Sequence, residues 1–187
     1  SKHGLTSGSL DPTAHIDIAV ELAILNDLVD FIPDDDAGIS VGAIVSLAGY
    51  GALGMLLMSC DTPFQATQIG VKYQKLTYLY GELSLKIFSD TSALCYLPYQ
   101  LPEKVQHFIV DRDISGTYRL IEDLRTYMNL DIGLTELWLP YPKPSNATSV
   151  EKRHNCPIIY DQPEARFYMA NEDLQRPFPT ANKTACR

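Results

Sequence analysis

Hydrophobic residues near the start of the chain recur at steps of three and four, the spacing of one face of an α-helix. Asp11 and Pro12 give a helix-start signal, because an Asp side chain can accept hydrogen bonds from free amides and Pro lacks a donor that would be unpaired there. The pattern predicts a helix that ends near Phe31. The residues expected on its core-facing side are Ile16, Val20, Ala23, Ile24 and Leu28.

The segment from Ile39 to Met58 is apolar nearly all round and rich in Gly and Ala, which is typical of closely packed buried helices. A break near residues 48–51 divides it into two short helices. A second helix-start signal follows at residues 61–63, with Gln65 near the position of a reciprocal capping side chain. The residues expected on the inner side of this next helix are Ala66, Ile69, Tyr73, Leu76 and Tyr80.

At Gly81 the hydrophobic period changes from that of a helix to that of a strand. Alternation over residues 83–88, a polar turn at 90–92 and a second apolar run at 93–96 predict an antiparallel hairpin. A long helix is then predicted from Glu103 to about Met128. The residues expected along one side of it are Val105, Phe108, Ile109, Arg112, Gly116, Leu120, Ile121 and Leu124.

Shorter elements are predicted in the last third of the chain. In order, they are a strand at 134–139, a proline-rich loop at 141–146, a short helix at 149–154, and strands at 157–160 and 166–169 joined by a turn at 161–164. The predicted fold class is α+β: N-terminal helices followed by a mostly antiparallel sheet (β-β-α-β-β) covered by the long helix. We expect residues 11–176 to form one domain, residues 1–10 to be a frayed or trimmed terminus, and residues 177–187 to begin a linker.

The composition fits one compact domain. The 187 residues are 45% hydrophobic and 20% charged, which is enough apolar material for a core. The formal net charge of −8 repels a phosphate backbone, so this segment is not expected to bind nucleic acid by itself. The 4 cysteines are scattered and the longest apolar stretch is too short for a bilayer span, so we expect a reducing compartment and no membrane segment or signal.

Catalytic and metal-binding spacings are missing from the sequence: no nucleophile-elbow, dinucleotide, P-loop or zinc-protease motif matches. We therefore expect neither an enzyme nor a metal or cofactor site. One alternative stays open at His107, on the long helix beside its inner stripe. It could be the axial ligand of a haem or gas-sensing domain, or a solvent-facing or hydrogen-bonded His.

Arg112 is unusual because it falls on the apolar stripe of the long helix, four residues after Phe108 and four before Gly116. A buried guanidinium keeps its proton and needs an anion. It either grips a ligand carboxylate, or forms an internal salt bridge, or extends to the surface. Its possible internal partners are Glu82, Glu136 and Asp113. Gly116 either lets another backbone approach or leaves volume beside the arginine.

Aromatic and Met residues are further candidate pocket linings, since a tyrosine offers an apolar face with one polar handle; each can equally be ordinary core. The pocket is expected between the long helix and the helices within residues 43–80. The predicted ligand-binding residues are Arg112, Tyr50, Met55, Met58, Tyr73, Phe108, Gly116 and Trp138. Tyr78, Tyr80, Tyr96 and Tyr99 have the same character.

Several short segments carry a resemblance to a known family. They are GISVG at 38–42, YGALGMLLMSC at 50–60, TPFQA at 62–66, LWLPYP at 137–142, NCPI at 155–158, RFYM at 166–169 and RPFP at 176–179. In order and spacing these segments resemble the N-terminal effector domains of AraC/XylS-type transcription regulators, in the subgroup labelled arabinose-binding type. The resemblance covers about residues 19–182.

The resemblance implies a domain that binds a small-molecule effector, dimerises, and controls an attached helix-turn-helix DNA-binding domain that is missing from this chain. DNA would be bound only through that missing domain. The effector is expected to be a carboxylate or an amphipathic molecule, and the subgroup's label does not make it arabinose. For the whole regulator the expectation is a cytoplasmic bacterial homodimer without a cofactor.

Overall fold

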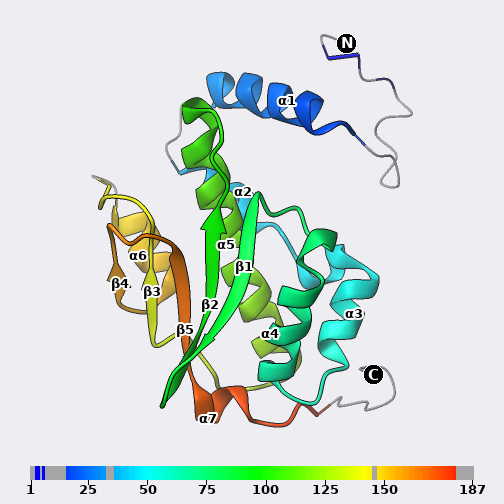
Figure 1. The fold of residues 1–187 in the computed structure, drawn as a ribbon, viewed down its shortest axis with the longest axis vertical. Helices are drawn as coiled ribbons and strands as arrows, with labels where there is room; N and C mark the ends of the chain where they lie inside the picture. The colour runs from blue at the N-terminus through cyan, green and yellow to red at the C-terminus, as the bar shows by residue number, and fades with distance from the viewer. Residues whose placement is uncertain (1–2, 5, 7–15, 33–35, 145–146, 180–187) are drawn as a thin grey trace.

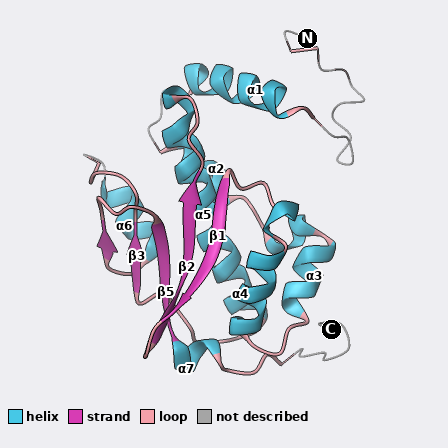
Figure 2. Ribbon diagram, in the orientation of Figure 1, coloured by secondary structure: helices cyan, strands magenta, loops and turns pink. Residues whose placement is uncertain are grey.

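The computed structural model describes residues 3–4, 6, 16–32, 36–144 and 147–179 of the chain. As predicted, the fold is α+β: a mostly antiparallel five-stranded sheet lies against a long helix (Figure 1). This helix, α5, extends from Glu103 to Tyr127, close to its predicted end. Figure 2 shows α5 behind the sheet, with shorter helices around it. α5 is therefore the element against which the other parts of the molecule pack.

Most of the shorter helices follow the sequence prediction. The predicted pair is confirmed as α2 (Ala37–Ala43) and α3 (Ala52–Met58), with a 3-10 helix, η2 (Leu47–Tyr50), in the break between them. α4 (Pro63–Lys72) begins at the predicted cap, where Thr62 Oγ1 accepts from the Gln65 N–H at 3.2 Å. α6 (Ala147–His154) and α7 (Asn171–Leu174) complete the set.

The predicted continuation of α4 to Tyr80 is wrong. The helix ends at Lys72, and after a short turn, η3 (Gln74–Leu76), the chain is extended. The Gln74 side chain explains this end, because its Oε1 accepts from the Leu83 N–H at 2.6 Å and its Nε2 donates to Leu83 O at 3.2 Å. The amide thus holds the turn against the first strand, and Leu76 is left 67% exposed.

α1 (Ile18–Phe31) is a helix as predicted, but its predicted core face is wrong. Ile16 and Leu28 are 43% and 37% exposed, and no residue of α1 is fully buried. The residues that pack against the core are Leu22, Leu25 and Val29. Because α1 is apolar on more than one side, its hydrophobic period could not select the side that faces α5. The start signal at Asp11 and Pro12 lies outside the described residues.

The sheet has the strand order β1-β2-β5-β3-β4. Its strands are β1 (Gly81–Ile87), β2 (Thr91–Pro98), β3 (Glu136–Trp138), β4 (Ile158–Ile159) and β5 (Ala165–Ala170). β1 and β2 form the predicted hairpin, and all pairs are antiparallel except β3 with β4. The predicted turn between the last two strands does not make a hairpin, because β3 lies between β4 and β5.

The middle of α5 is buried on all sides: every residue from Phe108 to Tyr118 is buried. The sheet covers one side, and α2 packs closely on another. Gly38 and Gly42 allow this approach, because a Cβ on them would lie 2.4 Å from Phe108 O and 2.3 Å from Arg112 O. The prediction of closely packed helices in this glycine-rich segment is thus confirmed, and the packing fixes the position of the buried residues of α5.

The last described residues stay packed against the domain. Phe178, within the segment predicted as a linker, is 3% exposed, and its N–H donates to Asp61 O at 2.8 Å. Residues 180–187, and most of the predicted terminal segment 1–10, lie outside the described part. Within the described residues, no helix combines the length and the apolar character that crossing a membrane requires.

Candidate functional site

An apolar cavity of about 80 Å³ lies among α3, α4, α5 and the first two strands. This is the place where the sequence predicts a pocket. Parts of the chain far apart in sequence build its wall. The lining residues are Tyr50, Leu53, Leu57, Ala66, Thr67, Gly70, Val71, Thr77, Leu79, Leu83, Leu94, Thr117, Leu120, Ile121 and Leu124. Of the predicted ligand-binding residues, Tyr50 is the one in this lining.

Two tyrosine hydroxyls beside the cavity are buried without a well-formed hydrogen bond to any described residue: Tyr50 Oη and Tyr78 Oη. Their ring centroids are 5.8 Å apart. Burial raises the pKa of Tyr78 to about 12 and also raises the pKa of Tyr50, so both hydroxyls are protonated donors at neutral pH. If one hydroxyl donates to the other, one donor still remains. An acceptor on a bound molecule would satisfy it.

The threonine hydroxyls near the cavity differ from these tyrosines. Thr67 Oγ1 donates to Pro63 O at 2.9 Å, and Thr77 Oγ1 donates to Gln74 O at 2.5 Å. Both hydroxyls are therefore used inside their own turn of the chain. Tyr50 differs from these threonines, because it forms with Tyr78 a pair of buried hydroxyls in which one donor is left without an acceptor among the described residues.

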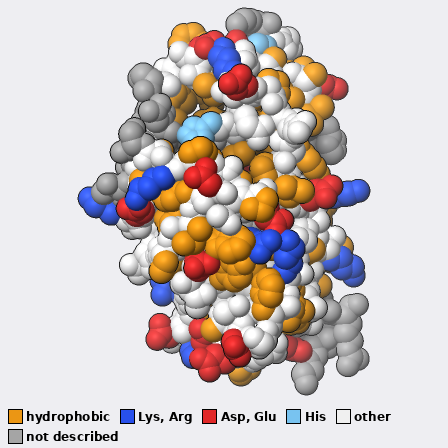
Figure 3. Space-filling view, turned by 60° about the vertical axis from the view of Figure 1, so that its left-hand side comes forward, with side chains coloured by type: hydrophobic (Ala, Val, Ile, Leu, Met, Phe, Trp, Pro, Cys, Tyr) orange, Lys and Arg blue, Asp and Glu red, His pale blue; other side chains and the backbone are white. Residues whose placement is uncertain are grey.

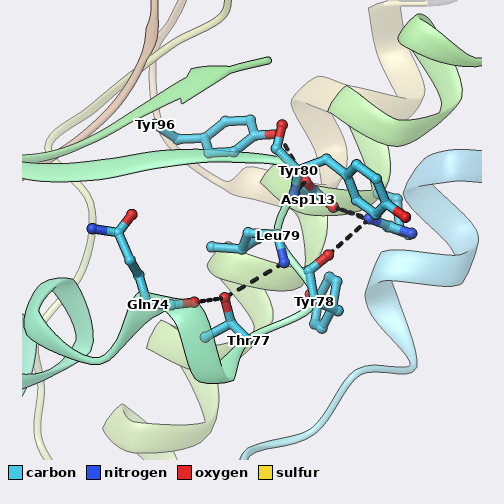
Figure 4. A network of polar contacts seen from close by, with 8 residues as sticks. Gln74, Thr77, Tyr78, Leu79, Tyr80, Tyr96 and Asp113 are labelled. Carbon is cyan, nitrogen blue, oxygen red and sulfur yellow. Dashed lines mark hydrogen bonds and ion pairs between the residues drawn. The ribbon is translucent and has the colours of Figure 1, made fainter. Parts of the chain in front are cut away.

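A buried polar cluster next to the cavity is centred on Asp113 of α5 (Figure 4). Arg112 Nε and Nη2 donate to Asp113 Oδ1 at 2.9 and 2.6 Å. The Tyr96 hydroxyl and the Tyr80 N–H donate to Asp113 Oδ2, both at 2.7 Å. Arg112 Nη2 also donates to Tyr78 O at 3.2 Å. The guanidinium thus forms the internal salt bridge that was one of its predicted alternatives.

The electrostatics of this cluster are balanced within the protein. Burial raises the pKa of the Asp113 carboxyl, and the Arg112 guanidinium is the strongest influence in the opposite direction. The guanidinium carbon of Arg112 lies 5.1 Å from the Tyr78 ring centroid and 5.4 Å from that of Tyr80, within cation–π range. The cluster therefore holds the segment before β1 against α5.

Gly116 makes room for the side chain of Tyr78. A Cβ at this position would lie 1.8 Å from Tyr78 Oη and 3.6 Å from Gly42 O. The gap that the sequence places beside the arginine is therefore filled by the tyrosine ring, and the α2 backbone approaches from another direction. Gly116 and Arg112 together fix where the Tyr78 hydroxyl lies.

The other predicted binding residues lie outside the cavity lining. Met55 is 67% exposed on α3. Phe108 is buried in the cluster that α1 covers, and Met58 and Tyr73 pack against the cluster that contains Phe178. These placements depend on which side of its helix each residue occupies. In a segment that is apolar all round, the sequence pattern does not show which side faces the cavity.

Trp138 lies on the face of the sheet turned away from α5, since its neighbour Leu137 is fully buried on the inner face. The guanidinium carbon of Arg166 is 4.5 Å from the Trp138 ring centroid, and the Tyr168 ring centroid is 5.3 Å away. Figure 3 turns the side with β3, β4 and β5 toward the viewer and shows hydrophobic side chains gathered there beside Lys and Arg. Trp138 thus belongs to an outer aromatic surface.

His107, the residue of the haem alternative, is 55% exposed, and its Nε2 lies 3.4 Å from Asp111 Oδ2. Its ring also makes an edge contact with Tyr141, with centroids 5.4 Å apart. In the described part of the chain, no group of three or more His, Cys, Asp or Glu side chains could hold a metal ion. The surroundings of His107 are those of a surface residue paired to a carboxylate.

Sequence reasoning missed most of the cavity wall. Two local signals could have found part of it: Leu53 and Leu57 are four residues apart on α3, and Ala66 and Gly70 have the same spacing on α4. Whether strand residues and Thr117 line the cavity depends on which strands pair and on how α5 is rotated about its axis. Those features are set by tertiary packing.

Comparisons with known proteins show the family and agree with the fold. A family model described as the arabinose-binding domain of AraC transcription regulators, N-terminal, matches residues 2–178. Uncharacterised HTH-type transcriptional regulators of Mycobacterium bovis and Mycobacterium tuberculosis are each 31% identical over 107 residues, which is 57% of this chain and 31% of each relative. The crystal structure of the transcriptional regulator CdpR from Pseudomonas aeruginosa has a similar fold, with a TM-score of 0.73 at 18% identity over 96% of this chain and 56% of that one.

Proposed function

The chain belongs to the family of arabinose-binding domains of AraC transcription regulators, and from this premise we propose that it senses a small effector in the cavity beside Tyr50. The observation that supports the proposal is a cavity beside two buried tyrosine hydroxyls, Tyr50 and Tyr78, whose pairing leaves one donor without an acceptor among the described residues. In the full regulator, occupancy of the cavity changes the arrangement of an attached DNA-binding domain. The domain itself is not an enzyme in this proposal.

The chemistry of the wall favours an amphipathic effector. Leucines and Val71 would contact an apolar body, and the hydroxyls of Tyr50 and Tyr78 would donate to one acceptor. A carboxylate effector would have to draw Arg112 away from Asp113, which would leave a buried anion without its main partner. We therefore propose a neutral oxygen-bearing effector, with Arg112 positioning Tyr78.

Effector binding must enlarge the cavity. Its volume of about 80 Å³ is below the roughly 300–1,000 Å³ of most small-molecule sites. The wall that can move is the pair of short helices α3 and α4, since the opposite wall is formed by Thr117, Leu120, Ile121 and Leu124 of the 25-residue helix α5. The bound and free states then differ in helix position, which gives an effector the differential affinity that a switch requires.

A displacement of α3 could be transmitted to the C-terminal segment through side-chain contacts. Leu53 and Leu57 line the cavity and also belong, with Phe178, to one buried cluster. In the proposed regulator the DNA-binding domain follows this segment, so movement of α3 would reach its attachment point. Coupling energies of about 1–3 kcal/mol suffice for such control. A homodimer in the bacterial cytoplasm, with DNA bound outside this domain, completes the proposal.

The test is calorimetry with a panel of short-chain alcohols, ketones and monocarboxylates. We expect neutral members to bind, and Tyr50→Phe to weaken their binding about tenfold, as loss of one hydrogen bond predicts. A cavity-filling variant, Gly70→Val, should abolish binding, since a Cβ there has its nearest neighbour, Leu57 Cδ2, at 4.0 Å and points into free space. Equal affinities for wild type and both variants would show that the effector does not bind in this cavity.

A further inference from the structure

A second hollow, of about 470 Å³, lies between α5 and α6 and shares no residue with the apolar cavity. It is lined by Tyr118, Arg119 and Glu122 of α5, and by Lys152 and Arg153 of α6. Three cationic side chains thus converge on one opening in a domain whose net charge is −8. The local charge is opposite to that of the whole molecule.

The charges around the hollow do not cancel. Arg119 Nε pairs with Asp123 Oδ1 at 2.8 Å, and Glu122 Oε2 pairs with Arg125 Nη2 at 2.9 Å. Lys152 and Arg153 form no ion pair with any described residue. Two positive charges therefore remain uncompensated at the opening, which matches the charge of a dianion.

Arg153 also has an unused donor. Its Nε is buried and makes no hydrogen bond to a described residue. The pKa of Arg153 is lowered, mainly by burial; Tyr118 acts in the opposite direction, and the nearby charge of Arg119 lowers the pKa further. The adjacent His154 adds no charge at neutral pH, because burial lowers its pKa to about 4. An anion in the hollow would relieve the repulsion between Arg153 and Arg119.

A purely structural explanation exists for these cations. Lys152 and Arg153 lie in the last turn of α6, where positive side chains stabilise the helix dipole. That role requires neither a shared opening with Arg119 nor a buried Nε. It also predicts an effect on stability alone, so binding measurements separate the two explanations.

We propose that the hollow between α5 and α6 binds a small dianionic oxyanion, such as a phosphate monoester or a dicarboxylate. The forked Arg153 guanidinium would donate to two oxygens, and Lys152 would supply the second charge. A small anion fits better than duplex DNA, because the cations line one hollow rather than a track and the rest of the domain repels a polyanion. The site is separate from the effector cavity and does not depend on it.

The test is titration of the chain with glycerol phosphate, malonate and acetate at about pH 8, where a phosphate monoester is doubly charged because its second pKa is about 6. Calorimetry gives affinities, and the NMR signal of the Arg153 Nε–H reports contact at the hollow. We expect both dianions to bind more tightly than acetate and to shift this signal. Binding of glycerol phosphate alone, or of malonate alone, would still support the site and would identify its chemistry.

The variant Lys152→Gln/Arg153→Gln should weaken dianion binding by at least about tenfold, the effect of one lost charge-assisted contact. The control variant Lys72→Gln/Lys75→Gln removes the same charge from α4 and η3, outside the hollow, and should bind as wild type does. Equal weakening in both variants, or no dianion binding by the wild type, would overturn the proposal. Thermal unfolding without anions shows whether the helix-dipole role is also lost.

Discussion

Two buried polar regions border the same stretch of α5, and they differ in whether their hydrogen bonds are satisfied. At Asp113, both carboxylate oxygens accept from two donors each, and Arg112 is neutralised. The buried hydroxyls of Tyr50 and Tyr78, whose ring centroids are 5.8 Å apart, have no partner among the described residues except each other, so one donor stays unsatisfied. Satisfied buried networks rigidify a fold, whereas an unsatisfied donor in a cavity marks a place for a ligand. This contrast underlies our proposal that the first region is structural and that the second senses the effector.

The largest expected effect comes from breaking the satisfied region. Asp113→Ala leaves the Arg112 charge buried without a partner and should lower the free energy of unfolding by about 3–5 kcal/mol. The matched control is Asp30→Ala, which breaks the exposed Asp30–Lys104 pair and should cost about 0–1 kcal/mol. Urea denaturation measures both. Similar losses for the two variants would mean that the buried pair has no special role.

His154 extends the comparison to pH. Its Nδ1 donates to Val150 O at 2.8 Å, while its Nε2 is buried without a hydrogen-bond partner among the described residues. Burial lowers its pKa from 6.5 to about 4, so the unfolded chain binds a proton more readily between these values. Stability should therefore fall as pH decreases from 6.5 to about 4, by up to about 3 kcal/mol from this residue. Unfolding measured across this range should have a shallower pH dependence in His154→Gln, and parallel curves would contradict the assignment.

A pair of equivalent substitutions tests the contrast most closely. Tyr96→Phe removes a donor to the Asp113 carboxylate and should destabilise the domain by about 1.5–3 kcal/mol. Tyr50→Phe removes a hydroxyl whose partner among the described residues is the neutral Tyr78 hydroxyl, so the free energy of unfolding should change by less than about 1 kcal/mol. Denaturant unfolding of both variants gives the comparison. A large loss in Tyr50→Phe would show that its hydroxyl already has a structural partner.

The smallest effect concerns the free space itself. Gly70 lies in α4 and lines the cavity, and a Cβ added there meets no atom closer than 4.0 Å. Gly70→Ala should therefore stabilise the domain by about 0.5–1 kcal/mol through helix propensity. The melting temperature should rise accordingly. A decrease would mean that the neighbouring side chains occupy more of the cavity than its volume indicates.

The sequence predicts local structure here better than tertiary structure. The hairpin of β1 and β2 and the extent of α5 follow from hydrophobic period, and the start of α4 follows from its capping residues. The pairing of β2 with β5 joins residues far apart in the chain, which no local pattern records. The core face of α1 was predicted wrongly for a related reason, since only its packing on α5 selects one of two apolar sides.

The candidate site shows the same division. Arg112 stands out in the sequence as a charge on an apolar stripe, and the structure identifies its partner as the adjacent Asp113. Tyr50 was predicted as a pocket residue and lines the cavity. Met55, from the same apolar segment, is exposed, because a run that is apolar all round does not reveal which side faces solvent. The sequence therefore indicated which kinds of residue line a pocket, but not which of these side chains point into it.

The central claim is that an effector occupies the cavity and accepts a hydrogen bond from Tyr50. Its most direct test is a crystal structure of the domain with the tightest-binding neutral member of the panel. The account predicts the ligand between α3, α4 and α5, with an oxygen about 2.5–3.0 Å from Tyr50 Oη and the short helices displaced from α5. A ligand bound elsewhere, with the cavity still closed around an unpaired Tyr50 hydroxyl, would contradict it.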